Sequence, residues 1–360
     1  MRQLPQYFLG LSMLGAAFLS ACNNDNVAEP DGNTLKPEAV RGTYIFNEGT
    51  FGASDASLSF YSIETGTVSH QVYSQKNADH SLGDGANDMQ QYGSKLYFTM
   101  TESNQVVVAA ADDASHLGVV QIDQPRSLAF YKDKAFVSSF SNAVFVIDTA
   151  SLQVLKEIPV GRTPEGITVA DGKVYVANSG WQDYVNNGGV HDKTVSVIDP
   201  ETLTEETQVE VAENVTQVLN DGKGHVLVSA ADIYNSTDFS LEKPGHLYVL
   251  HTSDLSVDAL DYGVQLMATA PEQPVYVVSA KDGAPALYTC TANFDLTPVD
   301  YFTGVEAYYA LGVAGDSGNV WVGDAHDYTR PGTVSFWDKA SNKVSSFEVK
   351  VSPMAFVFAQ

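Results

Sequence analysis

The chain has 360 residues, of which 44% are hydrophobic and 18% charged, with 28 glycines and 18 tyrosines. This composition favours many short strands joined by turns over long surface helices, and it excludes an intrinsically disordered chain. The 19 lysines and arginines against 44 aspartates and glutamates give a formal net charge of −25, so nucleic acid and anionic lipid surfaces would be repelled.

The first predicted element is an export signal. An apolar run over residues 7–18 is too short to span a membrane, which takes roughly 20 residues. The run ends in Leu19-Ser20-Ala21-Cys22, which resembles the lipobox of bacterial lipoproteins. We therefore expect residues 1–21 to be a signal peptide, Cys22 to be lipidated and residues 22–41 to be a tether, with the protein anchored outside the outer membrane. Simple signal cleavage beside a coincidental cysteine is the alternative.

One sequence unit recurs along the rest of the chain: a strand, a tight turn, a strand with a central aromatic residue, and a third strand that often ends in Asp. The clearest copy comprises Pro164–Ala170, the turn Asp171-Gly172, Lys173–Asn178 and Thr194–Asp199. The equivalent second-strand residues are Tyr44, Tyr97, Phe136, Tyr175, Leu227, Tyr276 and Trp321. Their separations of 53, 39, 39, 52, 49 and 45 residues predict a β-propeller with seven four-stranded blades.

The two ends of this repeat predict how the ring closes. The first copy begins directly at its second strand, near Gly42, whereas residues 353–358 repeat the first-strand pattern. We therefore expect residues 42–360 to form a single all-β propeller in which the C-terminal strand completes blade one and leaves no open sheet edge at the seam. Third strands are expected at 58–62, 105–110, 143–148, 194–199, 246–251, 286–291 and 333–338.

The two faces of the predicted ring differ. The loops between second and third strands lie on one face, the upper face, and are expanded at 47–56, 179–193, 232–245 and 324–332; turns on the opposite, lower face stay tight. Aromatic residues occur in these loops among Gly, Asn and Asp, a mixture typical of recognition loops, namely Phe51, Trp181, Tyr184, Tyr234, Phe239 and Tyr328. Alternatively, each aromatic caps its own blade.

Further candidate ligand-binding residues come from the same face. The connections between blades place polar and aromatic residues around the central mouth, namely Asn87, Asp88, Arg126, Glu165, Asn214, Tyr308 and Tyr309. Arg330 lies in the blade-seven loop. Except for Asn214 and Tyr309, these residues and the loop aromatics are expected to contact ligand.

The candidate catalytic motifs in the sequence are explained by ordinary structural roles. Gly315-Asp316-Ser317-Gly318 has the letters of a serine-protease motif but occupies a predicted hairpin turn. The eight histidines are scattered singly, and neither 84–88 nor 232–238 has calcium-loop spacing, so no metal site is expected. Cys290 lies in an apolar run and should be buried rather than reactive, and with Cys22 lipidated no internal disulfide can form. We expect a protein that is not an enzyme.

Two sets of motifs carry a family resemblance. Val174–Asn178 and Val195–Asp199 resemble the YncE-like "YVTN" propellers. Tyr44–Gly52, Leu82–Asp88 and Gln124–Ser127 are similar to the BtuG-like surface-lipoprotein propellers of Bacteroidetes. This resemblance implies capture of cobalamin (vitamin B12) or a related corrinoid on the upper face, as a transported ligand and not a cofactor, and delivery to a BtuB-like, TonB-dependent outer-membrane transporter.

Two other functions remain open from the sequence. One is capture of a different nutrient, such as a glycan. The other is a propeller hydrolase or lactonase, which would use central carboxylates and often a metal.

Overall fold

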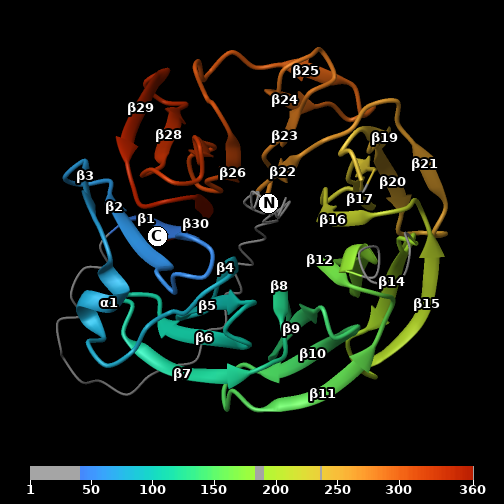
Figure 1. Cartoon of the computed structure of the whole chain (residues 1–360), viewed down its shortest axis with the longest axis horizontal. Coiled ribbons are helices and arrows are strands. Elements are labelled where there is room, and N and C mark those ends of the chain that lie inside the picture. The colour runs from blue at the N-terminus through green and yellow to red at the C-terminus, as the bar shows by residue number, and fades with distance from the viewer. Residues whose placement is uncertain (1–40, 183–189, 236, 360) are drawn as a thin grey trace, which may run out of the picture.

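The computed structural model describes residues 41–182, 190–235 and 237–359 (Figure 1). In these ranges seven four-stranded antiparallel sheets stand in a ring around a central axis, and each sheet is one blade. The predicted seven-bladed propeller is therefore confirmed. The lipidation site Cys22, the signal peptide and most of the tether lie outside the described residues.

Each blade runs from an innermost to an outermost strand (Figure 1). The first, innermost strands of blades one to seven are β30 (Pro353–Ala359), β4 (Ala86–Tyr92), β8 (Pro125–Tyr131), β12 (Pro164–Ala170), β16 (Val215–Asn220), β22 (Leu266–Ala268) and β26 (Tyr308–Val313). The second strands are β1 (Gly42–Asn47), β5 (Lys95–Met100), β9 (Lys134–Ser139), β13 (Lys173–Asn178), β17 (His225–Ala230), β23 (Val275–Ser279) and β27 (Val320–Asp324). These include every second-strand residue that the repeat predicted.

The outer half of each blade follows the same order. The third strands are β2 (Ser57–Ser62), β6 (Gln105–Ala110), β10 (Ala143–Asp148), β14 (Thr194–Asp199), β20 (Leu247–His251), β24 (Ala286–Cys290) and β28 (Thr333–Asp338). The fourth strands are β3 (Thr67–Ser69), β7 (His116–Gln121), β11 (Val154–Pro159), β15 (Thr204–Glu210), β21 (Val257–Ala259), β25 (Leu296–Pro298) and β29 (Lys343–Glu348).

Two further elements lie outside the blade pattern. The loop of blade five contains a hairpin of β18 (Ile233–Tyr234) and β19 (Leu241–Lys243), and the connection from blade one to blade two contains the short helix α1 (Val72–Lys76). No helix in the described part of the chain is long and apolar enough to cross a membrane.

Blade one is closed by the two ends of the propeller. β1 pairs with β2 on one side and with β30 on the other, and Tyr44 lies opposite Val357 across the seam. Backbone hydrogen bonds continue beyond the strands, from Glu48 N to Ser352 O at 2.9 Å. The C-terminal strand thus completes the first blade, as the sequence predicted.

The core consists of seven apolar clusters, and each lies between two neighbouring blades. Between blades one and two, Phe46 and Phe98 are fully buried with their ring centroids 5.2 Å apart. Between blades seven and one, Trp321 packs on Phe356 at 5.9 Å. Cys290 is buried in such a cluster, and burial raises the pKa of its thiol, in keeping with an inert side chain.

A hydroxyl group at the fifth residue of several second strands ties one blade to the next. Thr99 Oγ1 donates to Arg126 O at 2.6 Å, Ser138 Oγ to Glu165 O at 2.5 Å, and Ser229 Oγ to Val264 O at 2.8 Å. The first two bonds fix the backbone of Arg126 and Glu165, two residues of the predicted mouth. Inter-blade packing therefore positions the candidate site.

Candidate functional site

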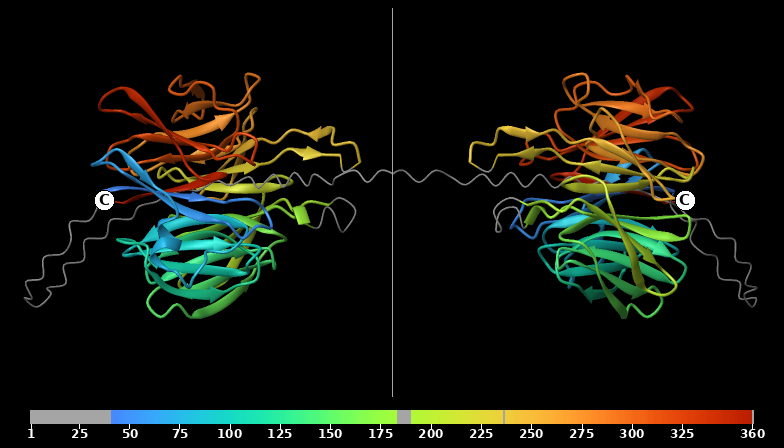
Figure 2. Two further views of the ribbon diagram at one scale, coloured as in Figure 1. Left: turned by 60° about the vertical axis from the view of Figure 1, so that its left-hand side comes forward. Right: turned by 90° about the vertical axis from the view of Figure 1, so that its right-hand side faces the viewer.

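The long loops all project from one face of the ring. Figure 2 shows the β18–β19 hairpin and the described residues that directly follow β13 (179–182) on the same side of the disc. In the described residues, the five most exposed aromatic side chains all belong to these upper-face loops, and they are Phe51, Trp181, Tyr234, Phe239 and Tyr328. Their exposed fractions range from 39% at Trp181 to 76% at Phe51. Tyr184 lies outside the described residues.

The inner strands change register where they begin, at the upper face. Six of the seven show this shift, and in each the inner strand has one residue more than the stretch of second strand that it opposes. Such bulges redirect side chains at the rim of a sheet. The extra residues include Asn87, Arg126, Glu165 and Tyr309.

A buried ion pair joins blades three and four at the mouth. Nε and Nη2 of Arg126 donate to Oε2 of Glu165 at 3.0 and 2.9 Å, and both side chains are more than nine-tenths buried. Burial raises the pKa of Glu165, whereas Arg126 and a hydrogen bond from the Trp181 side chain oppose that rise. The pair thus holds a charged network together where water is largely excluded.

Two aromatic rings complete this network. The guanidinium carbon of Arg126 lies 4.3 Å from the centroid of Phe140, and Phe140 meets Trp181 edge to face at 5.6 Å. Trp181 is therefore fixed by a ring contact and by its hydrogen bond to Glu165. Gly180 precedes it with φ +64°, and a Cβ there would lie 2.2 Å from Asp192 N, so the turn that presents Trp181 requires glycine. We call Arg126, Phe140, Glu165 and Trp181 the mouth cluster.

Neighbouring polar groups support the mouth cluster from blade two. Asn87 Nδ2 donates to the carbonyl of Arg126 at 2.8 Å, and Thr101 Oγ1 donates to Pro125 O at 2.8 Å. Asn87 is only 2% exposed. The structure thus places this predicted ligand-binding residue within the contact between two blades.

Asp88 is likewise buried, at 3% exposure. Its Oδ2 accepts hydrogen bonds from Leu128 N at 2.9 Å and Gln90 Nε2 at 3.1 Å, while Oδ1 has no partner among the described residues. Burial raises the pKa of Asp88 to about 7. Its observed role is to join blades two and three.

Blade seven adds a second aromatic pair. The Tyr309 hydroxyl donates to Oε2 of Glu48, and its ring meets that of Tyr328 edge to face at 5.5 Å. Burial raises the pKa of Glu48, and the charge of Arg126 opposes that rise, so this pair lies within electrostatic reach of the mouth cluster. Tyr308, which precedes Tyr309 at the start of β26, is half-buried, and burial raises the pKa of its hydroxyl.

Arg330 is paired within the same blade. Its Nη2 donates to both carboxylate oxygens of Glu306, at 2.7 and 2.6 Å. Asp324 accepts the backbone N–H groups of Glu306 and Ala307 at 2.9 Å each, which fixes the connection that carries Glu306.

Two loop aromatics stand farther from the mouth cluster. Phe239 is 75% exposed at the tip of the β18–β19 hairpin, where Tyr234 donates to Asp232 Oδ2 at 3.0 Å. Phe51 belongs to the blade-one loop, which is tied to Asp84 by Gly52 N at 3.0 Å. Neither Phe239 nor Phe51 has a ring contact in the described structure.

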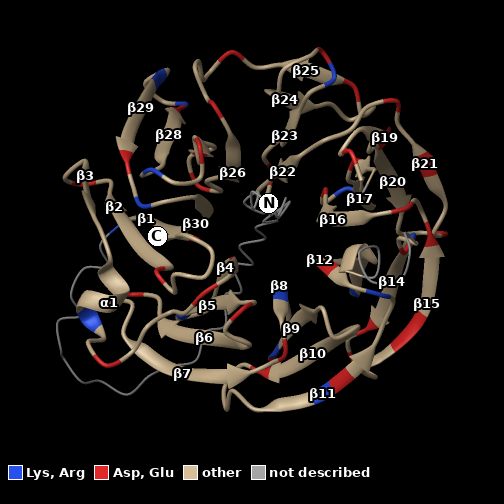
Figure 3. Ribbon diagram, in the orientation of Figure 1, with Lys and Arg blue, Asp and Glu red and all other residues tan. Residues whose placement is uncertain are grey.

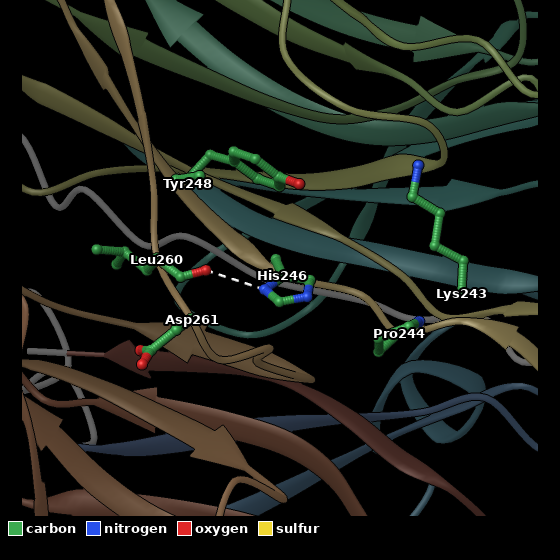
Figure 4. A pocket seen from close by; sticks show the side chains of 7 residues that line it. Lys243, Pro244, His246, Tyr248, Leu260 and Asp261 are labelled. Carbon is green, nitrogen blue, oxygen red and sulfur yellow. Dashed lines mark hydrogen bonds between the residues drawn. The ribbon is translucent and has the colours of Figure 1, made fainter.

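A shallow hollow of about 440 Å³ lies beside the hairpin, over the paired third and fourth strands of blade five and the segments next to them (Figure 4). Its lining residues are Lys243, Pro244, His246, Tyr248, Ala259, Leu260 and Asp261. His246 Nδ1 donates to Leu260 O at 2.9 Å, so in the neutral ring Nε2 is an acceptor. None of the predicted site residues lines this hollow.

Sequence reasoning missed three members of this arrangement. Phe140 follows β9 in a short loop, Glu48 follows β1, and Thr101 follows β5, so each is the first residue after a second strand. That shared position at the upper rim was the available signal. Within the described ranges no group of three or more His, Cys, Asp or Glu is placed to hold a metal ion.

Residues 41–264, which form three strands of blade one and all of blades two to five, match the family described as Domain of unknown function (DUF5074). The chain belongs to the DUF5074 family. No curated protein matches this DUF5074 member significantly.

Solved structures share the fold of this DUF5074 chain at low sequence identity. A quinoprotein alcohol dehydrogenase-like protein from Bacteroides thetaiotaomicron is similar with a TM-score of 0.63 and 17% identity, over 89% of this chain and 78% of that chain. Dihydro-heme d1 dehydrogenase NirN gives a TM-score of 0.57 and 9% identity, over 92% and 77%. Kuenenia stuttgartiensis hydrazine synthase gives 0.53 and 15%, over 71% and 76%. These likenesses show the propeller fold alone.

Proposed function

We propose that this DUF5074 propeller is a non-catalytic surface lipoprotein that captures cobalamin or a related corrinoid on its upper face and passes it to a TonB-dependent outer-membrane transporter. The observation that carries the proposal is the one-sided distribution of the exposed aromatic residues, all of which lie in upper-face loops. Exposed aromatic groups of this kind favour binding of a flat, partly apolar molecule.

The charged groups of the upper face argue against an anionic polymer as the ligand. The cations of the mouth and the blade-seven loop, Arg126 and Arg330, are already paired with Glu165 and Glu306. Glu48 and Asp84 add further carboxyls nearby, so an anionic polymer would be repelled. A corrin ring suits this setting, because its plane can rest on aromatic rings and its peripheral amides can bond carboxylate, hydroxyl and backbone groups.

The anchor is part of the same proposal. Lipid on Cys22 would hold the protein at the outer membrane, where a captured nutrient can be handed to a transporter. The variant Cys22→Ala should leave the membrane fraction or remain unprocessed. Recovery of a processed, membrane-bound variant would contradict the anchor.

Calorimetric titration with cyanocobalamin tests the ligand. We expect saturable binding to one site per protein. Absence of binding by the folded wild type would contradict the corrinoid assignment.

A second candidate, capture of a saccharide, is favoured by the hollow of blade five. There the Tyr248 ring, the acceptor nitrogen of His246 and the Asp261 carboxylate lie around a shallow, mostly apolar surface (Figure 4). Titration of the wild type and of His246→Ala with a panel of oligosaccharides distinguishes saccharide capture at this hollow from corrinoid capture on the upper face.

A further inference from the structure

The outer rim of the propeller presents seven sheet edges, one from the fourth strand of each blade. An exposed edge carries a row of unpaired backbone N–H and C=O groups, and natural proteins protect such edges by shortness, charge or proline. Three of the seven, β3, β21 and β25, are only three residues long. Three more carry charges, as in Lys156 and Glu157 of β11, the glutamates of β15, and Lys343 of β29.

The fourth strand of blade two is neither short nor charged and has no proline, and its one irregularity is a register shift at Leu117, where Gly118 pairs with Val108 and His116 with Ala109. β7 is six residues long, with the sequence HLGVVQ, and has no charged residue and no proline. Figure 3 shows β7 entirely in the colour of uncharged residues, whereas β11 and β15 carry charges. Leu117 and Val119 on β7 are 48% and 40% exposed.

Among the described residues, the α1 segment covers the first residue of this edge. Asn77, which follows α1, accepts from His116 N at 2.8 Å through Oδ1, and the His80 ring stacks on His116 at 3.9 Å. Residues 117–121 have no such cover from the α1 segment.

We propose that β7 is a strand-pairing interface and that its partner is β7 of a second copy of this chain. An antiparallel pairing centred on Val119 places Val119 opposite Val119 of the partner copy and Gly118 opposite Val120, within the regular part of β7 beyond the register shift at Leu117. Two four-stranded blades then join into one continuous sheet.

Charge restricts pairing between two copies to uncharged surfaces such as this edge. Each copy has a formal net charge of −25, so contacts between most surfaces bring like charges together. β7 offers an uncharged strand to an uncharged strand. Since β7 is the one unprotected fourth strand among the seven, the pairing closes as a two-fold dimer and does not continue into a filament.

Analytical ultracentrifugation of the full-length protein tests the proposal. A strand–strand contact is small, so we expect a weak dimer with a dissociation constant on the order of 10 µM. Higher salt should strengthen it, because screening reduces the repulsion between two acidic bodies. Val119→Lys should shift the protein to monomer, whereas Val344→Lys, at an exposed position of the charged edge β29, should leave the dimer intact.

Two cysteine variants then test the register. Val119→Cys should form a disulfide between copies under oxidation, mapped by peptide mass spectrometry, whereas Leu117→Cys should not, because Leu117 lies two residues from the two-fold axis and is not opposite Leu117 of the partner copy. Thermal unfolding of each variant checks that it is folded. A protein that stays monomeric up to roughly 100 µM at both low and high salt would overturn the proposal. So would a dimer that folded Val119→Lys retains, or equal cross-linking by the two cysteine variants.

Discussion

The mouth cluster contains a buried ion pair that two aromatic side chains hold in place. Arg126 and Glu165 are almost fully buried, and removing one partner of such a pair leaves the other charge uncompensated. The pair is held by Phe140 on one side and Trp181 on another. A Trp that is bonded through its indole and packed through its ring loses little freedom on binding, which favours its use as an anchor.

The buried Asp88 makes the stability of the protein depend on pH. Because burial raises its pKa from 3.8 to about 7, the unfolded chain ionises first as pH rises. This carboxyl therefore lowers the free energy of unfolding progressively as the pH rises from 3.8 to about 7. Above pH 7 the free energy of unfolding stays lowered. Asp88→Asn can keep both hydrogen bonds through its oxygen, so it should stabilise the protein at pH 8 by about 1–4 kcal/mol, and by less at pH 5.

Urea unfolding at the two pH values measures this difference. The exposed Asp327 is the matched control, because hydrogen bonds from Thr329 and Arg330 lower its pKa to about 2. Asp327→Asn should therefore not stabilise the protein at either pH. An Asp88→Asn variant whose gain is the same at both pH values would show that the buried carboxyl does not ionise as described.

Among the elements, β30 matters most for the integrity of the ring. Its Phe356 is fully buried and packs on Trp321 of blade seven, so it links the last blade to the first. Without β30, the inner edge of β1 would lose its backbone partners.

Phe356→Ala should accordingly lower the free energy of unfolding by about 3–5 kcal/mol, through lost contacts and the cavity left behind. Phe51→Ala, in an exposed loop, should change it by less than about 0.5 kcal/mol. Truncation after Val351 should be more damaging than either change. A truncated chain that unfolds at the urea concentration of the wild type would refute the closure.

The strands were predictable because their pattern is local. Alternating apolar residues around Tyr97 or Tyr175, bounded by turn residues, identify a strand whatever lies beside it. The bounds of β6, β10, β14 and β28 agree with the sequence prediction at both ends. The register shifts at Arg126 and Glu165 and the hairpin inside the blade-five loop were not predictable, because they depend on contacts between blades and on the path of a long loop.

The candidate site was predictable only in outline. The sequence indicated the face and most of the aromatic residues, since loop length and composition are visible in the repeat. It could not show that Asn87 and Asp88 are buried between blades, or that Phe140 orients Trp181. Those facts depend on side-chain directions at strand ends, which a periodic pattern does not determine.

At the scale of the whole molecule, the two faces have different chemistry. Tight turns cover the lower face, and the exposed aromatic rings lie on the upper one. The β7 edge lies on the outer wall, away from the central mouth, so pairing there would leave the upper face free for ligand (Figure 1). The ring supplies a rigid support, and the loops supply recognition.

The most direct test of capture on the upper face is calorimetric titration of cyanocobalamin into variants of the two faces. Trp181→Ala should weaken binding roughly 30- to 1000-fold, because loss of a central aromatic anchor costs about 2–4 kcal/mol. Tyr234→Ala and Tyr328→Ala should weaken it to a lesser degree. Ile63→Ala, at an exposed apolar residue in the β2–β3 turn of the lower face, should alter affinity by less than about 0.5 kcal/mol. Weakened binding in Ile63→Ala, with unchanged binding in all three upper-face variants, would contradict the account.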